Sequence, residues 1–494
     1  MAGKELAAKL SPVDGKPIAE FCQAAGLGGR REALSRLRRL LVERRGAIVA
    51  TITRETGKPL VESYFEVVEA LECLKFMPAR AAKLLRERRV VLKQPTFFLK
   101  KVRQVWEPYG VVGLISPWNF PFSIPMGELL QALAAGNTVV FKPSEWTPFT
   151  GLLLGRLLTD AGLPPGVVNV VTGDGRTGAA LVAAAIDKVA FTGSVPTGLA
   201  IGRAAAERGI PASMELGGKD PAIVRADADL ATAPEGVLWG AVMNCGQGCS
   251  AVERVYVERG IHDAFVERLA AACKRLVVGD GAEPATSVGP LINPAQRAKV
   301  CAQIEDAVHR GARVVCGGEA PARLAASGGW FLEPTVLANV DHTMAVMREE
   351  TFGPVVPVMA YAGEDEAVRL ANDCVYGLGA SIWTRDLAGA EALARRLRAG
   401  NVWVNDVLFS HAAPETTWGG TGLSGHGYTH GDAGLLTYVH PKWISIDGST
   451  APKDGWYPYG PERREFADAV VELLYGHDLL KRARAIPRAL RGMR

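Results

Sequence analysis

The sequence lacks the features that usually mark a membrane-spanning, secreted or nucleic-acid-binding chain. It has no uncharged run of about 18 apolar residues, so a spanning helix is not expected. The N-terminal Met-Ala-Gly-Lys-Glu-Leu has no apolar core like that of a signal peptide. The net charge of +4 over 494 residues is small, and no aromatic-basic RNA signature accompanies it. These absences favour an ordinary soluble protein without a nucleic-acid partner.

The eight cysteines form no Cys-x-x-Cys pair and no disulfide framework. Cys245 and Cys249 lie close together, but no second pair follows at the spacing of a zinc site, so no metal is expected. Free thiols are typical of a reducing compartment, which favours the cytoplasm. The length of the chain exceeds what one simple core accommodates, so two or three domains are expected.

The segment Asn244–Arg254 places Gly246 and Gly248 just before Cys249. Glycine lets the backbone turn sharply or approach a ligand, and a nucleophilic thiol needs such access. Taken alone, a buried structural cysteine is the commoner role. Upstream, however, Met214–Lys219 places Glu215 beside another pair of glycines. A thiol and a carboxylate are the two components of covalent catalysis through a thioester.

These motifs carry a resemblance to a known family. Glu-Leu-Gly-Gly-Lys at 215–219, followed about 30 residues later by Gly-Gln-x-Cys-x-Ala-x-x-Arg, resembles the aldehyde dehydrogenase superfamily. Three further motifs occur in the order of the family: Pro117-Trp-Asn-Phe-Pro121, the turn 191–198 and the segment 348–355. The resemblance spans roughly residues 30 to 445 and implies an NAD(P)-dependent, non-acylating enzyme.

Repeated strand and helix units from 111 to 216 indicate an α/β fold with a doubly wound parallel sheet. The resemblance implies a variant Rossmann cofactor domain, an α/β catalytic domain and a small β oligomerisation element, in a homodimer or homotetramer. The expected domains are 1–97 with 111–216 for the dinucleotide, 217–430 for the nucleophilic cysteine, 98–110 with 431–447 for oligomerisation, and a C-terminal extension at 448–494.

Asn119 follows an apolar strand expected at 111–116. Two prolines fix its loop and present it at the carboxyl end of that strand, where ligands bind in open α/β sheets. An amide there can donate a hydrogen bond to a developing oxyanion, although most turn asparagines only satisfy their own backbone. The loop is similar to the oxyanion loop of the family, which implies a catalytic role.

Two glycine-rich turns compete for the pyrophosphate of the cofactor. Gly173-Asp-Gly-Arg-Thr-Gly178 matches the dinucleotide fingerprint, but no acidic residue about 20 positions later closes a second strand. The turn Phe191–Gly198 also exposes amides at a helix N-terminus and is similar to the cofactor motif of the family. We therefore place the pyrophosphate at 193–198 and the first turn nearer the adenine.

The resemblance also assigns the two riboses and the nicotinamide. Residues matching Lys142 and Glu145 bind the adenosine ribose, and those matching Glu350 and Phe352 hold the nicotinamide ribose and ring. A carboxylate accepts a hydrogen bond from a free 2′-hydroxyl and repels a 2′-phosphate, so NAD is favoured and NADP is left open. The implied cofactor residues are Ser116, Pro117, Trp118, Lys142, Ser144, Glu145, Gly175, Phe191, Thr192, Gly193, Ser194, Gly198, Leu216, Glu350 and Phe352.

The implied reaction oxidises an aldehyde to a carboxylic acid. The Cys249 thiolate attacks, Asn119 and the Cys249 amide hold the oxyanion, and Glu215 activates the water that hydrolyses a thioester. Because a free cysteine has a pKa of about 8.5, the site is expected to lower it. One alternative is a dehydrogenase that transfers the acyl group to coenzyme A, and Glu215 argues against it. The other is a non-catalytic structural protein, and the presence of Asn119, Glu215 and Cys249 together argues against that.

The substrate pocket is expected to carry little charge, which favours an uncharged aliphatic or aromatic aldehyde. His411, His426 and His430 are interpreted as loop histidines, because glycines beside His426 make a metal-binding helix improbable. The residues expected to line the pocket are Phe122, Gly127, Gly248, Ser250 and Phe409.

The segment beyond Ile446 extends about 48 residues past the usual end of the family. Residues 462–480 are expected to form one amphipathic helix, followed by a basic end. A helix docked on a neighbouring subunit is favoured over a peripheral contact with anionic lipid.

Overall fold

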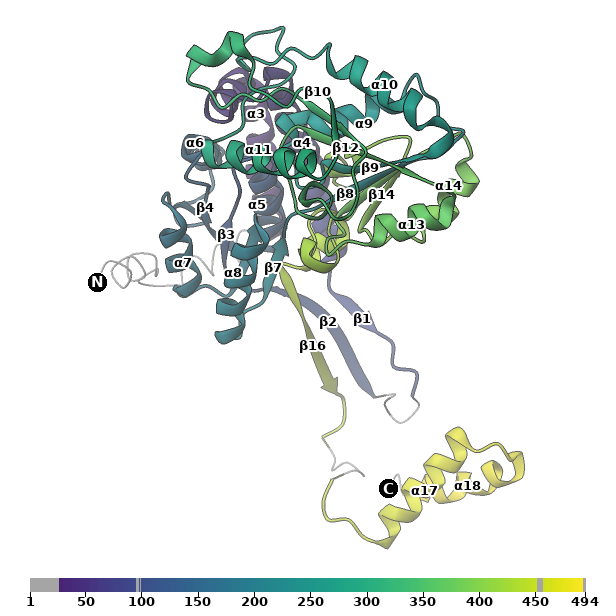
Figure 1. Cartoon of the computed structure of the whole chain (residues 1–494). Coiled ribbons are helices and arrows are strands. Elements are labelled where there is room, and N and C mark those ends of the chain that lie inside the picture. The colour runs from purple at the N-terminus through teal and green to yellow at the C-terminus, as the bar shows by residue number, and fades with distance from the viewer. Residues whose placement is uncertain (1–25, 95–96, 98, 451–455, 492–494) are drawn as a thin grey trace. The chain divides into compact units, whose positions relative to one another are not determined.

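The structure of the chain, a computed structural model, describes residues 26–94, 97, 99–450 and 456–491. It contains two compact units (Figure 1). The first comprises the residues up to 86 together with 106–441, and the second comprises 87–105 together with 442–494. Most of the segment 1–27, expected to be irregular, lies outside the described residues. Among the described helices, none is long and apolar enough to cross a bilayer.

The first unit contains a six-stranded sheet, which carries the strand and helix pattern predicted for 111–216. Its order is β15-β7-β6-β3-β4-β5, and every pairing except that of β15 with β7 is parallel. Parallel strands buried on both faces need continuous apolar runs, which this part of the sequence supplies. The strands are β3 (Val111–Ile115), β4 (Thr138–Lys142), β5 (Val168–Val170), β6 (Lys188–Thr192), β7 (Ala212–Glu215) and β15 (Gly425–His426).

Helices cover both faces of this sheet, because alternate side chains of each strand point to opposite sides. Val139 and Phe141 pack with one group of helices, whereas Val140 packs with another. The first group is α3 (Gly26–Thr56), α4 (Leu60–Leu84), α5 (Ser123–Ala135) and α6 (Pro148–Asp160), and the second is α7 (Gly175–Ala183) and α8 (Val195–Glu207). This is the doubly wound architecture that the sequence predicted.

A seven-stranded sheet forms the rest of the first unit, in the order β10-β11-β12-β9-β8-β13-β14. Only β10 pairs antiparallel with its neighbour. Helix α13 ends at Asn372, and the next strand begins at Gly379. The strands are β8 (Asp220–Val224), β9 (Val252–Glu258), β10 (Arg313–Cys316), β11 (Thr335–Ala338), β12 (Val355–Tyr361), β13 (Gly379–Trp383) and β14 (Asn401–Val404). The longer helices are α9 (Ala233–Val242), α10 (His262–Cys273), α11 (Pro294–His309), α13 (Glu364–Asn372) and α14 (Leu387–Ala394).

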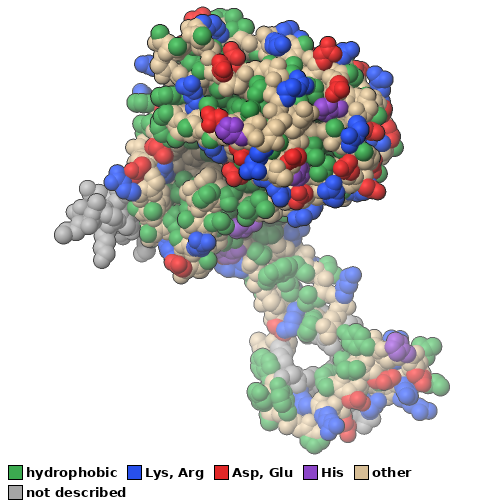
Figure 2. Space-filling view, viewed as in Figure 1, with side chains coloured by type: hydrophobic (Ala, Val, Ile, Leu, Met, Phe, Trp, Pro, Cys, Tyr) green, Lys and Arg blue, Asp and Glu red, His purple; other side chains and the backbone are tan. Residues whose placement is uncertain are grey.

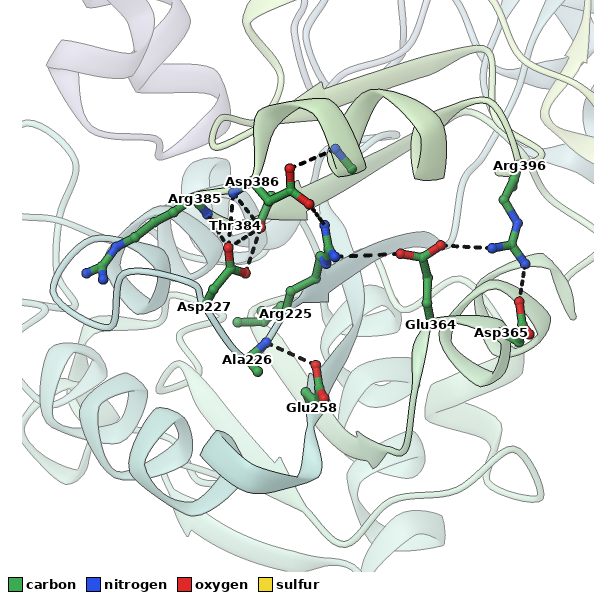
Figure 3. A network of polar contacts seen from close by, with 12 residues as sticks. Arg225, Ala226, Asp227, Glu258, Glu364, Asp365, Thr384, Arg385, Asp386 and Arg396 are labelled. Carbon is green, nitrogen blue, oxygen red and sulfur yellow. Dashed lines mark hydrogen bonds and ion pairs between the residues drawn. The ribbon is translucent and has the colours of Figure 1, made fainter.

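A polar network fastens the ends of β8 and β13 (Figure 3). Asp227 accepts two hydrogen bonds from Thr384 Oγ1, at 2.7 and 2.8 Å, and one from each of the next two backbone amides. Arg225 pairs with Glu364 at 3.8 Å and with Asp386 at 3.3 Å. Exposed pairs of this kind contribute little each, so the network mainly fixes the turn that follows β13.

The carboxyl ends of several strands line up along one edge of the six-stranded sheet. Ile115 lies opposite Lys142, and Thr192 lies opposite Glu215. Open α/β sheets bind ligands at this edge. The chain leaves β7 here and passes through residues 216–219 directly into β8, the first strand of the second sheet. The predicted cofactor and catalytic motifs therefore meet where the two sheets are joined.

The second unit contains a three-stranded sheet in the order β1-β2-β16. Its strands are β1 (Arg88–Val90), β2 (Lys100–Pro108) and β16 (Val439–Asp447). The strands expected near 97–109 and 436–446 are thus present. Residues 87–97 were assigned to the cofactor domain, but β1 pairs antiparallel with β2, with Arg88 opposite Gln104.

The C-terminal extension forms two helices where one was expected over 462–480. The chain breaks after α17 (Pro461–Tyr475), and α18 (Leu479–Arg491) begins where Asp478 accepts hydrogen bonds from the amides of Leu480 and Lys481. The two helices pack through Ala469, Ala485 and Ala489. Exposed hydrophobic side chains remain on this unit beside basic ones, as Figure 2 shows.

Candidate active site

The loop before Cys249 is a tight, left-handed turn between α9 and β9. Asn244, Cys245 and Gly246 have φ angles of 55°, 56° and 68°. A Cβ atom at Gly246 would lie 2.2 Å from the carbonyl oxygen of Gly353, so this position needs glycine. The turn directs Cys249 toward the cavities described below.

Cys249 is partly exposed and lines two cavities at once. One cavity has a volume of about 270 Å³ and an almost wholly apolar lining. The other, a cleft of about 190 Å³, is shared with the predicted cofactor motifs. A thiol between two openings can meet one reactant from each side.

Asn119 lies in the loop between β3 and α5 and lines the cleft together with Cys249. Its side chain is buried, and Nδ2 donates a hydrogen bond to the carbonyl oxygen of Gln247 at 2.9 Å. That bond uses one amide hydrogen, and the second has no acceptor among the described residues. The amide therefore stands beside the cysteine loop with a free donor.

A buried ion pair holds the Asn119 loop in place. Lys58 Nζ lies 2.7 Å from Glu66 Oε1 and donates to the Asn119 carbonyl at 2.6 Å. Glu66 Oε2 accepts hydrogen bonds from the amides of Phe122 and Ser123, at 2.9 and 3.1 Å. Lys58, just before α4, and Glu66 on α4 thus fix both ends of the loop. The sequence analysis did not identify these contacts with the loop, because they join residues about 60 positions apart.

Loss of this ion pair should destabilise the enzyme strongly. We expect Lys58→Met to lower the free energy of unfolding by about 3–5 kcal/mol, because it leaves a buried carboxylate without its cation. The matched control is Lys75→Met, whose partner Glu72 is exposed and whose loss should cost less than about 1 kcal/mol. Denaturant unfolding measures both, and equal effects would contradict the expectation. Adding Glu66→Gln to Lys58→Met should restore part of the loss.

Glu215 ends β7 in a buried position. Neither carboxylate oxygen has a hydrogen-bond partner in the described part of the chain. Burial raises the pKa of Glu215 well above its ordinary value, and the carboxylate of Glu128 raises it further. Glu215 does not itself line either cavity, although Leu216 and Gly217 line the cleft. Its carboxylate thus lies close to the site, has no hydrogen-bond partner among the described residues and favours the protonated form.

The electrostatics of Cys249 differ from the expectation of a lowered pKa. Burial raises the pKa of its thiol to about 12, and the carboxylates of Asp220, Glu215 and Glu350 contribute to the rise. Low polarity and nearby negative charge both disfavour a thiolate. In this state of the protein the cysteine is a protonated thiol.

The cleft has the features that a dinucleotide requires. Helix α8 begins beside it, so the amides near Ser194 can hold an anionic pyrophosphate. Glu350 accepts a hydrogen bond from the Gly218 amide at 3.1 Å, and a Cβ atom at Gly217 would lie 2.3 Å from that carboxylate. The predicted cofactor residues that line the cleft are Pro117, Trp118, Thr192, Gly193, Ser194, Leu216, Glu350 and Phe352.

The other predicted cofactor residues lie outside this lining. Lys142 and Glu145 follow β4 at the same sheet edge, with Nζ and Oε2 3.5 Å apart. Gly175 opens α7 and not the helix beside the cleft. The remaining members of this group are Ser116, Ser144, Phe191 and Gly198. Their binding roles stay predictions.

The sequence analysis missed two cleft residues, Gln296 and Lys299. They lie one turn apart on α11, and Gln296 Nε2 donates to the carbonyls of Thr351 and Phe352 at 3.0 and 2.8 Å. Two polar residues one turn apart are common on surface helices, so the sequence gave no signal that could have identified them.

A buried ion pair between Lys219 and Glu253 holds part of the cleft in place without lining it. Lys219 Nζ pairs with Glu253 Oε2 at 2.7 Å, where both side chains are buried. Glu253 in turn accepts hydrogen bonds from the amides of Thr351 and Phe352, at 2.7 and 2.8 Å. These contacts fix the segment that carries Glu350 and Phe352.

The apolar cavity contains some of the residues predicted for the substrate. Gly248, Ser250 and Phe409 line it. Phe122 and Gly127 do not: Phe122 packs in the core, and a Cβ atom at Gly127 would lie 3.3 Å from the His430 ring. Four lining side chains, those of Phe65, Val68, Trp239 and Phe409, are substantially exposed. The apolar wall therefore continues to the protein surface. Among the described residues, no cluster could hold a metal ion.

A cysteine that lines both an apolar cavity and a cleft suited to a dinucleotide is the arrangement expected of a thiol-dependent dehydrogenase. Residues 22–444 match the model of the aldehyde dehydrogenase family, and the chain belongs to that family. It is 40% identical over 468 residues to the 4,4′-diapolycopene aldehyde oxidase of a Methylomonas species, covering 94% of this chain and 87% of that protein. It is also 40% identical to the betaine aldehyde dehydrogenase of Cereibacter sphaeroides, covering 84% of each.

A solved structure agrees with the sequence relatives. The crystal structure of betaine aldehyde dehydrogenase from Staphylococcus aureus in complex with NAD⁺ has a TM-score of 0.84 and 32% identity, and it covers 90% of this chain and 89% of that one. The chain is an NAD(P)-dependent aldehyde dehydrogenase that oxidises an aldehyde. The fold class and the reaction expected from the sequence are thereby confirmed.

Proposed function

We propose that this enzyme oxidises long, uncharged aldehydes to acids through Cys249. The observation that supports this most strongly is the position of the sulfur, between a cleft suited to a dinucleotide and an apolar cavity whose wall reaches the surface. An aldehyde bound in the cavity presents its carbonyl carbon to the thiol, and its chain extends along the apolar wall.

The first step forms a bond between Sγ of Cys249 and the carbonyl carbon. The partly exposed thiol first releases its proton to solvent, because the thiolate is the nucleophile. The aldehyde oxygen becomes an oxyanion, which the free amide hydrogen of Asn119 and the Cys249 amide hold. Each donor of this kind typically lowers the barrier by about 3–4 kcal/mol.

The residues around the cleft would hold the cofactor. Ser194 and the start of α8 bind the pyrophosphate, while Glu350 and Phe352 bind the nicotinamide ribose and ring. When bound, NAD⁺ accepts the hydride, and with it two electrons, from the carbon attached to sulfur. What remains on Cys249 is a thioester.

Hydrolysis returns the enzyme to its starting state. Glu215 takes a proton from water, the resulting hydroxide attacks the thioester carbon, and the carbon–sulfur bond breaks to release the acid and the thiol. To reach that water, the Glu215 side chain must turn toward Cys249 from its position behind the cleft. It makes no hydrogen bond with the described residues that would hold it back.

The cofactor preference follows from Glu145. Its carboxylate is half exposed at the end of β4, beside Lys142. A carboxylate there accepts a hydrogen bond from the 2′-hydroxyl of NAD and repels the 2′-phosphate of NADP. We infer that NAD is the preferred oxidant.

Several features argue against a cationic substrate such as those that the names of the betaine and aminoaldehyde relatives indicate. Two carboxylates, Glu66 and Glu69, line the apolar cavity, but each is already paired, with Lys58 and His411 respectively. The remaining lining is aromatic and aliphatic. The name of the Methylomonas relative indicates an uncharged polyene aldehyde, which fits this lining better.

Steady-state kinetics with a series of straight-chain aldehydes and betaine aldehyde test the substrate. We expect kcat/KM to rise with chain length, by up to about fourfold for each methylene that becomes buried. We expect NAD to give a higher kcat/KM than NADP with every substrate. A preference for betaine aldehyde, or a flat dependence on chain length, would overturn the substrate assignment while leaving the reaction itself intact.

We also propose a homodimer or homotetramer in the cytoplasm. The three-stranded sheet supports assembly, since Trp443, Ile444 and Ile446 of β16 are exposed. Seven free cysteines in the described residues support a reducing compartment. Helix α18 carries basic residues together with exposed apolar ones, and we propose that it docks on a neighbouring subunit and not on lipid.

A further inference from the structure

The apolar cavity contains one polar feature that its proposed chemistry does not use. His411 lies on the short helix α15 (Phe409–Ala412), and its Nδ1 lies 2.9 Å from Oε1 of Glu69 on α4. Both residues line the cavity. The His411 side chain is 22% exposed, so the pair faces the space that an aldehyde would occupy.

The ring of His411 is held in one orientation. It stands edge-on to Trp418, with the ring centres 4.7 Å apart, and edge-on to His430 at 5.2 Å. Phe120, beside Asn119, lies on another side at 6.4 Å. A ring fixed by its neighbours loses little freedom when it binds a ligand, which makes it suitable as a specificity group.

The second ring nitrogen of His411 is available. In the part of the chain that the structure describes, Nε2 has no hydrogen-bond partner, and it is not among the polar atoms sealed from solvent. A polar nitrogen without a partner at an apolar wall is costly unless water or a ligand satisfies it.

The charges that face this ring favour its protonated form. Burial lowers the pKa of His411, but the carboxylates of Glu69 and Glu66 outweigh burial and raise it above its ordinary value. Burial lowers the pKa of the adjacent His430 to about 4, so that ring is neutral near pH 7. With Nδ1 in an ion pair with Glu69, a protonated His411 has Nε2–H left as a donor for the cavity.

We propose that His411 is a substrate-binding residue that donates a hydrogen bond from Nε2 to a neutral oxygen carried on the aldehyde chain. This inference rests on the proposed function of the cavity as the aldehyde site. It narrows the substrate class to long apolar aldehydes that also bear a carbonyl or hydroxyl oxygen away from the reacting carbon.

Charge balance favours a neutral oxygen over a carboxylate. The imidazolium of His411 is compensated by Glu69, and the carboxylate of Glu66 is compensated by Lys58. No lysine or arginine is among the described residues that line the cavity. A substrate carboxylate would be buried there without a cation of its own, which is costly.

The test compares decanal with decanals that carry one ketone or hydroxyl oxygen at successive carbons. We expect one position to give a kcat/KM about tenfold or more above that of decanal, the scale of a hydrogen bond to a charged donor. His411→Leu should bring this ratio close to one. His411→Gln, which keeps an amide donor, should retain part of it, and melting temperatures report whether each variant folds.

A pH profile of the unmodified enzyme gives a second readout that needs no variant. When His411 loses one proton, the adjacent Glu69 carboxylate favours the tautomer that keeps the other proton on Nδ1, and Nε2 becomes an acceptor. As the pH rises, the kcat/KM of the ketone-bearing decanal should therefore fall to that of decanal. The hydroxyl-bearing decanal should keep its higher kcat/KM, because a hydroxyl can also donate a hydrogen bond to Nε2. A purely structural ion pair would leave both ratios constant.

The outcomes separate the two proposals. The role of His411 alone is overturned if the enzyme oxidises decanal but prefers none of the oxygen-bearing decanals. It is also overturned if the ratio of kcat/KM between an oxygen-bearing decanal and decanal is the same in the unmodified enzyme and in His411→Leu. A preference for a carboxylate-bearing decanal overturns the assignment of a neutral oxygen. Failure to oxidise decanal or any of its derivatives overturns the proposed function, and the role of His411 with it.

Discussion

Cys249→Ala should reduce aldehyde oxidation by at least about a thousandfold, because no other group can form the bond to the carbonyl carbon. Cys249 is the only cysteine among the described residues that lines both the apolar cavity and the cofactor cleft. Binding of NAD should be nearly unchanged, since the cleft keeps its other residues. NADH formation measures activity, and quenching of protein fluorescence measures binding of the cofactor.

Cys245→Ala is the matched control for this variant. Cys245 lies in the same turn, is buried and lines neither cavity. Burial raises the pKa of its thiol far above the ordinary range, and neither cavity gives an aldehyde access to it. We expect most of the activity to remain, with a modest loss of stability from the small cavity created. Activity in Cys249→Ala comparable to that in Cys245→Ala would eliminate Cys249 as the nucleophile.

Short motifs made much of this site predictable. Asn119, Glu215 and Cys249 each stand in a motif where glycine or proline fixes the backbone, and such local constraints are visible in a sequence. The choice between the two glycine-rich turns also followed from local signals. A missing acidic residue argued against Gly173–Gly178, and the structure places Gly193 in the cleft lining and the first turn outside it.

What the sequence could not show depends on contacts between distant segments. The pair Lys58–Glu66 reaches the loop of Asn119 from another helix. His411 was interpreted as a loop histidine, because nothing near it in the sequence indicates that Glu69 lies beside it. Periodicity identifies which face of a helix is apolar, but not which buried charges meet across a core.

The electrostatics of the site were the least predictable property. The expected lowering of the Cys249 pKa came from the chemistry that a nucleophile needs. The observed rise comes from burial and from three carboxylates on other strands and loops, none adjacent to Cys249 in sequence. Desolvation depends on the complete packing of the site, so a motif carries no information about it. Similarly, the break between α17 and α18 follows from a cap at Asp478 within a continuous amphipathic pattern.

Glu215→Gln should separate the two halves of the reaction. An amide cannot take a proton from water, so steady-state turnover should fall by about a hundredfold to ten-thousandfold. The first turnover does not need this base for hydrolysis, so a rapid burst of NADH, stoichiometric with active sites, should remain. Stopped-flow absorbance at the NADH band measures both phases. An unchanged steady rate would exclude Glu215 as the base that hydrolyses the thioester.

The raised pKa of Glu215 predicts how kcat depends on pH if Glu215 is the base. The variant Glu128→Gln tests this prediction. A base must be deprotonated to act, so kcat of the unmodified enzyme should fall as the pH drops through the raised pKa of Glu215. Burial raises the pKa of Glu128 to about 8, and the Glu128 carboxylate in turn raises the pKa of Glu215. Glu128→Gln removes one negative charge, so the pKa of Glu215 should fall and the acid limb should move to lower pH. An acid limb that stays in place in Glu128→Gln would show that a different group limits turnover.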